Sequence, residues 1–362
     1  MEEAKVNGFF ISEKISRIRW VPEELKTSEK FITGSWGNST NYVKCFKLVR
    51  NQFSEEANEF VPKCNSKVPF KGDITGLEFL DPDKIVVSSS DGTISILSLT
   101  RADIDTLSVK AKSNILHQYP TGVEASCTSI SIFEKDIASV GEDGCLHVLS
   151  SNSLTPLRSI ENADSCTITT CSFVNSNEIL TGNRMGGVKI FDIRSEETFP
   201  QNTLYISCED DKKSNYVSCL AFHPTQKHII FAGSEEGSFT VWDLRQPNYP
   251  ASYLSAHTSA ITEIAFHKSQ PTKLFTASEN GELWQWTQNT LLMNTGIESQ
   301  MSLNTDSENV NPWLNGERAK HKINVTSLFS GLKKSINTFD TVDSKIICGC
   351  DNESVYLIDS IL

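Results

Sequence analysis

One unit recurs along the 362-residue chain and strongly limits the folds that the chain can adopt. Each copy has a β-like run, a turn of small residues that leads to Asp, Asn or Glu and then Gly, and a second, alternating β-like run. The clearest copies lie at 232–245, 181–194, 276–288, 139–150 and 87–99, and weaker copies lie at 32–48 and 348–359. A repeat of roughly 40–50 residues indicates an array whose units cannot bury their faces alone.

The turns of these copies mark the blades of one domain. They fall near residues 41, 92, 144, 186, 237, 281 and 353, with Asn41 and Glu353 in the place that Gly takes elsewhere. Asp-Gly and Asn-Gly supply the positive φ that a tight hairpin needs. A further alternating run precedes each copy, so each repeat holds three strands plus an outer one, as in a propeller blade. Seven copies predict an all-β, seven-bladed β-propeller that spans residues 1–362.

The two ends of the chain are predicted to join the ring. The last β-like run, 354–359, ends three residues before the C-terminus, so no later segment can supply a fourth strand to blade seven. The segment Val6–Ile11 is β-like and includes Phe9 and Phe10. We therefore expect this N-terminal segment to be the outer strand of blade seven, with both Phe side chains buried, which would cover an exposed sheet edge.

The segment 288–321 interrupts the repeat. It is rich in Asn, Ser and Thr, and it lengthens the last period of the repeat to 72 residues. Long loops in compact domains are usually functional or disordered. Trp313 stands in this polar setting, and two readings of it remain open. Trp313 is either an anchor for a protein partner, as Trp is enriched at interface hot spots, or it folds back onto blades six and seven.

Composition excludes several classes of function. The chain has 33 Lys and Arg against 45 Asp and Glu, a net charge of −12, and no basic cluster, which disfavours direct binding to nucleic acid. No apolar run approaches the roughly 18 residues of a membrane span, so membrane insertion is not expected. The acidic N-terminal stretch has no apolar core of the kind found in signal peptides, which predicts a cytosolic or nuclear protein.

No pattern of catalytic, cofactor-binding or metal-binding residues is apparent. The ten cysteines are scattered without a CxxC pair, and Cys348 and Cys350 lack His or Cys neighbours at zinc spacing. The stretch 182–189 superficially resembles a phosphate loop, but a β-like run follows it instead of a helix. We expect neither a cofactor nor an enzymatic activity.

The repeat resembles the WD-repeat family. The resemblance is carried by Trp242-Asp243, Phe191-Asp192 and Ala256-His257. In blade six, four residues match the family's structural tetrad of hydrogen-bonded side chains, with Asn in place of Asp: His257, Ser278, Asn280 and Trp286. The resemblance implies that this tetrad ties an outer loop to the third strand of the blade.

Two arginines allow an alternative function. Arg194 and Arg245 each stand two residues after the Asp of adjacent blades. This pair resembles the signature of WD-repeat substrate receptors for cullin–RING ubiquitin ligases, whose arginines contact the ligase adaptor. The simpler interpretation is that each Arg pairs with a neighbouring Asp at the surface, which contributes little to stability.

A closer resemblance covers nearly the whole chain. It is carried by the segments 14–22, 33–36, 139–144, 161–164, 274–284 and 325–328. These segments are similar to the WD-repeat nucleoporin family that is named for a mass of forty-three kilodaltons. The resemblance implies a non-enzymatic scaffold subunit of the Y-shaped outer-ring subcomplex of the nuclear pore.

The same resemblance implies partners and locations. The subunit would dock on a stacked-helix nucleoporin of the short arm of the Y, as a monomer within a hetero-oligomer. It would support transport of protein and mRNA between nucleus and cytoplasm. It would lie at the nuclear envelope, in the nuclear pore complex, and at kinetochores in mitosis.

Overall fold

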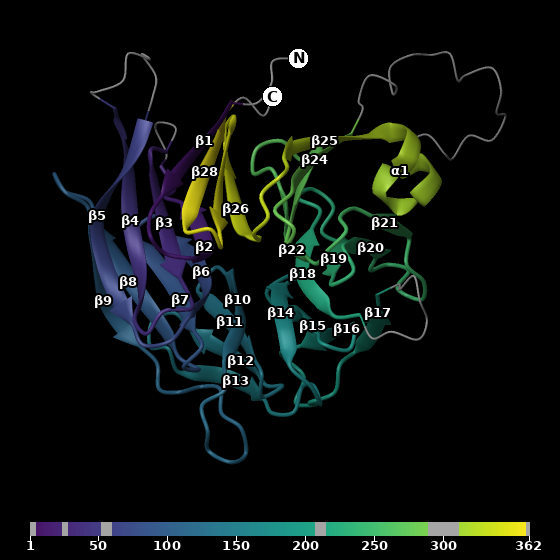
Figure 1. Ribbon diagram of the computed structural model, residues 1–362. Coiled ribbons are helices and arrows are strands. Elements are labelled where there is room, and N and C mark those ends of the chain that lie inside the picture. The colour runs from purple at the N-terminus through teal and green to yellow at the C-terminus, as the bar shows by residue number, and fades with distance from the viewer. Residues whose placement is uncertain (1–4, 24–27, 52–59, 207–214, 289–310, 360–362) are drawn as a thin grey trace.

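The computed structural model places the strands in seven sheets of four, arranged around a central axis (Figure 1). It describes residues 5–23, 28–51, 60–206, 215–288 and 311–359. Each sheet is antiparallel throughout and is formed by strands that follow one another in the chain, except in blade seven. The predicted seven-bladed β-propeller is confirmed.

Blades one to six each run from an inner strand beside the axis to an outer strand at the rim. The strands of blades one to three are β2 (Ile15–Trp20), β3 (Lys30–Ser35), β4 (Asn41–Arg50), β5 (Phe60–Phe70), β6 (Ile74–Asp81), β7 (Lys84–Ser89), β8 (Ile94–Thr100), β9 (Thr106–Lys112), β10 (Cys127–Phe133), β11 (Asp136–Gly141), β12 (Leu146–Ser150) and β13 (Pro156–Ile160). Those of blades four to six are β14 (Ile168–Phe173), β15 (Glu178–Asn183), β16 (Gly187–Asp192), β17 (Asn202–Tyr205), β18 (Val217–Phe222), β19 (Ile229–Ser234), β20 (Ser238–Asp243), β21 (Ser252–Ser255), β22 (Ile261–Phe266), β23 (Lys273–Ser278), β24 (Leu283–Gln288) and β25 (Ile323–Phe329).

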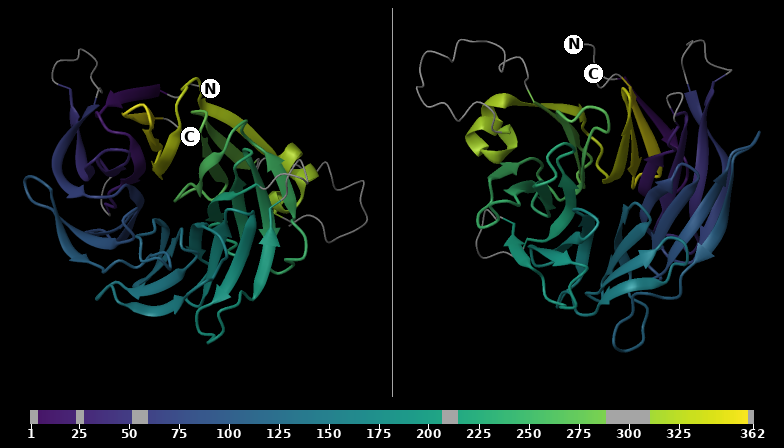
Figure 2. Two further views of the ribbon diagram at one scale, coloured as in Figure 1. Left: turned by 60° about the horizontal axis from the view of Figure 1, so that its bottom comes forward. Right: turned by 180° about the vertical axis from the view of Figure 1, so that it is seen from behind.

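Blade seven joins the two ends of the chain. Its strands β26 (Ile336–Val342), β27 (Lys345–Cys350) and β28 (Ser354–Asp359) come from the C-terminal end, and β1 (Lys5–Phe10) pairs with β28 as the outer strand. The purple β1 and the yellow β28 lie side by side in Figures 1 and 2. The predicted closure is confirmed, with one difference: Phe9 packs against the core between blades one and seven, whereas Phe10 is 70% exposed.

The hairpin turns explain why each repeat needs a small residue. The turn glycine has a positive φ at Gly92, Gly144, Gly186, Gly237 and Gly281. A Cβ on Gly237 would also lie 2.2 Å from the backbone oxygen of His257. Both the positive φ and this close contact therefore exclude a side chain at Gly237. Blade one differs from the expectation, because its left-handed residue is Gly37 and Asn41 already begins β4.

The core lies between neighbouring blades. Buried apolar side chains alternate along the strands and interlock with those of the next blade, so that seven separate clusters fill the spaces between sheets. Most residues of β19, β20 and β23 are fully buried because both faces of these strands are covered. No single blade could exclude water from both faces, so the ring folds as one unit.

The interruption after β24 is partly folded. Residues 289–310 lie outside the described residues, and the chain then forms a short 3₁₀ helix, η3 (Pro312–Leu314), and a helix, α1 (Gly316–Lys322), before it enters β25. Figure 1 shows α1 beside the outer strands of blades five and six. Within the described residues, no helix has the length and apolar character that a membrane crossing requires.

Candidate functional site

Short polar side chains beside the channel, four hydroxyls and one amide, connect neighbouring blades to one another. The second residue of an inner strand donates a hydrogen bond to a backbone oxygen of the next inner strand at five of the seven junctions in the described chain. The donors and acceptors are Ser16 and Ile74, Thr128 and Ile168, Thr169 and Val217, Thr262 and Ile336, and Asn337 and Ile15. The strand register shifts at this residue in all seven blades, as at a β-bulge, which turns its side chain out of the sheet.

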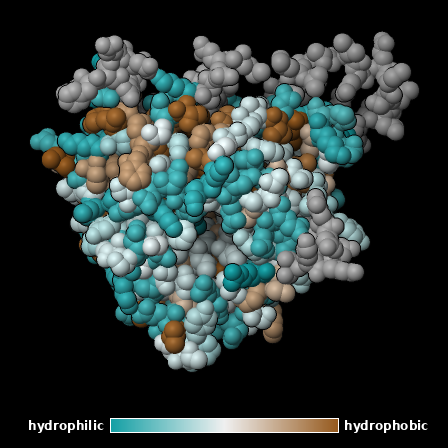
Figure 3. Space-filling view, in the orientation of Figure 1, coloured by the Kyte–Doolittle hydropathy of each residue, from teal (hydrophilic) through white to brown (hydrophobic). Residues whose placement is uncertain are grey.

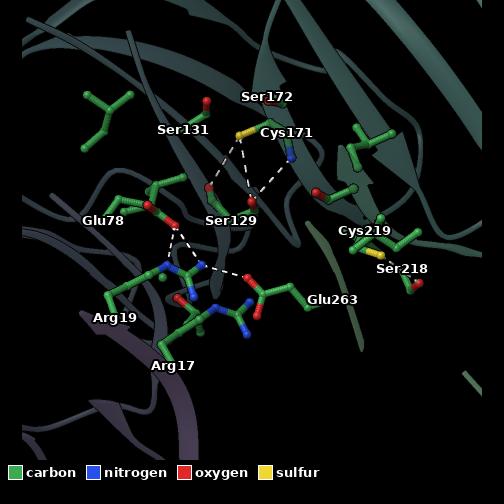
Figure 4. Close-up of a pocket in the computed structure, with 18 of the residues that line it drawn as sticks. Arg17, Arg19, Glu78, Ser129, Ser131, Cys171, Ser172, Ser218, Cys219 and Glu263 are labelled. Atoms are coloured by element: carbon green, nitrogen blue, oxygen red, sulfur yellow. Dashed lines mark hydrogen bonds and ion pairs between the residues drawn. The ribbon is translucent and has the colours of Figure 1, made fainter. Parts of the chain in front are cut away.

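A partly buried arginine, whose side chain is 15% exposed, occupies the channel. The Arg19 guanidinium from β2 lies 2.9 Å from Glu78 of β6 and 2.9 Å from Glu263 of β22, and so connects three blades (Figure 4). Glu263 also accepts a hydrogen bond from the backbone of Phe339 in blade seven. Burial alone would lower the pKa of Arg19, but the two carboxylates raise it above its ordinary value. This network links four of the seven blades through one cation.

The channel around this network is polar. A cavity of about 560 Å³ is lined by Ser, Thr and Cys side chains from the inner strands, together with Arg17, Arg19, Glu78 and Glu263. Figure 4 shows the guanidinium of Arg19 directed at the two carboxylates, and hydrogen bonds from protein groups reach Oε1 of Glu78 and both carboxylate oxygens of Glu263. The nine described cysteines are all free, and burial raises the pKa of Cys219 to about 12 and that of Cys171 further. These buried thiols are therefore poor nucleophiles.

Blade six contains a hydrogen-bonded network that differs from the predicted tetrad. His257 lies 2.8 Å from the Thr276 hydroxyl through Nε2 and 3.0 Å from a Glu282 carboxylate oxygen through Nδ1. Trp286 Nε1 donates to the same Thr276 hydroxyl at 3.0 Å. Burial lowers the pKa of His257, although Glu282 opposes this shift. The network ties the loop before β22 to β23 and β24, which is the structural role that the resemblance implied.

Two of the four predicted members lie beside this network instead of within it. Ser278 donates to the side-chain oxygen of Asn280, and Asn280 donates to the Thr258 hydroxyl at 3.0 Å. The hydroxyl that joins the histidine to the tryptophan therefore belongs to Thr276, and the acceptor at the turn belongs to Glu282. Both corrections are shifts by two residues. Thr276 and Ser278 share a face of β23 because they are two residues apart on the strand, whereas Asn280 and Glu282 both lie in the turn that follows it.

Blade three contains a related network that the sequence reasoning missed. His117 is fully buried and lies 2.9 Å from Asp143 through Nδ1 and 2.6 Å from the Ser139 hydroxyl through Nε2. Burial alone would lower the pKa of His117, but its hydrogen bond to Asp143 raises it to about 9. His147 of β12 stacks on this ring, with 4.9 Å between ring centroids. Among the described residues, His117, Asp143 and His147 have donor atoms close enough together to hold a metal ion.

The two arginines of the alternative function form equivalent local pairs. Arg194 binds Asp192 through two guanidinium nitrogens, at 2.7 and 3.0 Å, and Arg245 binds Asp243 in the same way, with a closest distance of 2.5 Å. Their side chains are 66% and 63% exposed. The hydrogen bonds from Arg194 lower the pKa of Asp192 to about 2. Both arginines are thus satisfied within their own turns, as the simpler interpretation expects.

Trp313 is not available as an anchor for a partner. Its side chain is fully buried, with the rings of Phe231, Phe239, Phe266 and Trp286 packed around it at centroid distances of 5.3–6.4 Å. Its backbone oxygen accepts a hydrogen bond from a serine hydroxyl of β21. Trp313 therefore folds back onto the ring. It packs between aromatic side chains of blades five and six, and not on blades six and seven as expected.

Twelve large hydrophobic side chains are exposed among the described residues. On the face shown in Figure 3, hydrophilic and intermediate residues prevail, and hydrophobic atoms gather towards the end of the ring where both termini lie. The most exposed large hydrophobic residues of the described chain are Tyr249 and Phe199, at 81% and 79%, in the turns that follow Arg245 and Arg194. Exposed aromatic side chains beside arginine are typical of protein–protein interfaces.

Comparisons with known proteins identify relatives that match nearly the whole chain, and others that match part of it. The chain is 33% identical over 381 residues to nucleoporin Nup43 of Homo sapiens, an alignment that covers 99% of this chain and 98% of the human protein. Nup43 of Mus musculus is similar to the same extent. The nuclear pore complex protein nup43 of Dictyostelium discoideum is 29% identical over 136 residues, which are 37% of this chain and 31% of that protein. A family model described as nucleolar protein 10-like, N-terminal domain, matches residues 149–314.

Proposed function

Because the chain belongs to the Nup43 family of nucleoporins, we propose that it is a non-enzymatic scaffold subunit of the nuclear pore complex. The similarity to the human relative over 99% of this chain is the observation that carries the proposal. This similarity covers every blade and both ends of the chain, so it extends beyond a shared fold. The proposal also places the protein at the nuclear envelope.

The proposal extends to a position within the pore. The protein is a subunit of the Y-shaped outer-ring subcomplex and docks on a stacked-helix nucleoporin of its short arm. In this position it supports the transport of protein and mRNA, and in mitosis it associates with kinetochores. The resemblance of the segments described above to the nucleoporin family supports these statements.

The architecture suits a docking platform. Backbone pairing between β1 and β28 closes the ring, and side chains beside the channel connect adjacent blades. In the channel, Arg19 forms ion pairs with Glu78 and Glu263. These ion pairs connect blades one, two and six and so help to hold the ring together. A rigid ring of this size offers two faces and a rim, each large enough for an interface of about 1,600 Å².

Affinity purification tests the proposal directly. We expect the protein, tagged at its own locus, to co-purify with stacked-helix nucleoporins at near-equal amounts and to label the nuclear rim. Crosslinking of the purified complex would then show which blades approach the partner. Recovery of a ligase adaptor and a cullin in place of nucleoporins would contradict the proposal and favour the alternative function.

Replacement of both arginines separates the two functions. In Arg194→Ala/Arg245→Ala, we expect nuclear-rim labelling and the recovery of nucleoporins to match those of the unchanged protein. Each arginine is exposed and bonds to its own Asp, so its removal alters surface charge and little else. The matched control is Lys84→Ala, which removes one similarly exposed ion pair from blade two. Loss of an adaptor–cullin complex in the double variant, but not in the control, would support the ligase reading.

A further inference from the structure

The strand that completes blade six differs from the other outer strands. β25 is the last strand of its sheet, so within the described structure one of its edges faces away from the blade. Proteins usually protect such edges by keeping the strand short or by placing Lys or Pro on it. The outer strands β17 and β21 have four residues each, and the longer ones β1, β5, β9 and β13 carry Lys or Arg. β25 has seven residues and no charged side chain.

The middle of β25 is open to solvent. Residues 324–327 are all exposed, and Val325 is 46% exposed. Successive side chains of a strand point to opposite faces, so the described structure leaves both faces of this stretch uncovered. Figure 1 shows β25 at the rim of the ring, with α1 joined to its start. An extended segment of another chain can therefore reach β25 and pair with its backbone, as in β-augmentation.

Positive charge is concentrated before and after β25, although the whole chain carries a net charge of −12. Residues 311–334 include one acidic residue, Glu317, and five basic ones: Arg318, Lys320, Lys322, Lys333 and Lys334. The last turn of α1 brings Lys320 and Lys322 directly before β25, and Lys333 and Lys334 are exposed in the connection that follows it. Lys320 pairs with Glu317 at 3.1 Å but remains 67% exposed. An acidic protein thus presents basic groups around one uncharged strand edge.

We propose that β25 binds an extended, acidic segment of a nucleoporin partner, which adds one strand to blade six. This inference rests on the proposed function, since it concerns how the scaffold subunit docks. Backbone hydrogen bonds to β25 supply affinity, and carboxylates at the ends of the added segment face the lysines of α1 and of the connection after β25. A segment that pairs with all seven residues of β25 extends over about 23 Å.

The charge pattern disfavours a second copy of this chain as the occupant. If β25 paired with β25 of another copy in antiparallel fashion, α1 of each copy would lie towards Lys333 and Lys334 of the other. Parallel pairing would bring identical lysines together. Like charges across an interface oppose association. An acidic segment meets no such repulsion in either direction.

Charge reversal tests the electrostatic part of the proposal on the full-length protein. In Lys320→Glu/Lys334→Glu, we expect the affinity for the purified stacked-helix nucleoporin to fall at least tenfold. The melting temperature should stay nearly unchanged, because both side chains are exposed. The matched control is Lys71→Glu/Lys110→Glu, which changes the net charge equally at two exposed lysines away from blade six. The control should bind like the unchanged protein, whose affinity should fall as salt is raised.

Hydrogen exchange tests the backbone part. We expect the outward-facing amides of residues 324–327 to exchange at least tenfold more slowly in the nucleoporin complex than in the free protein. The amides of β9, the seven-residue outer strand of blade two, should exchange equally in both states.

Three outcomes would overturn the proposal while nucleoporins still co-purify. They are equal exchange of β25 in the two states, equal affinity of the charge-reversal variant and its control, and protection of β25 in the free protein that rises with concentration as dimers form. The last outcome would identify a second copy as the occupant. Failure to recover any nucleoporin would instead contradict the proposed function, and this inference with it.

Discussion

Replacement of Trp313 with alanine is expected to lower the free energy of unfolding by about 3–5 kcal/mol, the usual range for emptying a buried tryptophan site. Trp313 is fully buried, and its ring meets those of Phe231 and Phe266 edge to face and that of Phe239 at a tilt. The alanine variant would leave a cavity among these rings that strands on both sides hold open. Denaturant unfolding of the purified protein measures the loss.

Two further variants separate packing from other effects. Trp313→Phe should cost much less than the alanine variant, because the indole Nε1 has no hydrogen-bond partner in the described structure and the phenyl ring still fills most of the site. Trp36→Ala changes a partly buried tryptophan outside this cluster and serves as the control. Binding to the pore partner should fail in Trp313→Ala only where folding fails. An unchanged unfolding midpoint would show that η3 contributes nothing to the ring.

Local patterns were sufficient to predict the ring. Each hairpin has its own turn signal, such as Gly144 or Gly237, and the flanking residues alternate between apolar and polar because each strand covers a neighbouring blade. The count of blades follows from these local signals alone. The closure by β1 was also predictable, since blade seven had three strands and one unassigned β-like segment remained.

The side-chain networks were harder to predict, because a β-strand gives equal spacing to several candidates. Thr276 and Ser278 are two residues apart on β23 and share a face, so either hydroxyl could meet His257. Only the loop that carries His257 selects Thr276. The hydrogen bond between His117 and Asp143 was hard to predict for a different reason. The two residues are 26 positions apart in the sequence, and strands β10 and β11 lie between them.

A residue pair at the start of each inner strand is a sequence signal for the contacts between blades. Every inner strand begins with an apolar residue followed by a small polar one: Ile15-Ser16, Ile74-Thr75, Cys127-Thr128, Ile168-Thr169, Val217-Ser218, Ile261-Thr262 and Ile336-Asn337. An alternating strand would accept many polar residues at the second place. The restriction to Ser, Thr and Asn reflects the bulge there, which turns a short donor towards the backbone of the next blade.

Deletion of residues 1–12 is expected to lower the stability of the folded ring more than any single substitution does. It removes all six residue pairings of β1 with β28 and uncovers the backbone groups of β28 as an exposed edge. It also removes Val6, Phe9 and Ile11, which pack on the cores beside blade seven. Full burial of such a side chain contributes about 1.5–3 kcal/mol, and a whole domain is stable by about 5–15 kcal/mol. Three partly buried side chains and a lost strand therefore take away a large part of the stability.

Thermal unfolding and size-exclusion chromatography measure this outcome. We expect the truncated protein to melt at a much lower temperature and to aggregate, because an unpaired edge strand recruits other chains. Phe10→Ser is the matched control, since Phe10 is 70% exposed and its replacement should leave the melting temperature nearly unchanged, unlike Phe9→Ser. A synthetic peptide of residues 1–12 should restore part of the lost stability by pairing with β28. If the truncated protein stayed monomeric with the same melting temperature, backbone pairing at blade seven would not be what holds the ring closed.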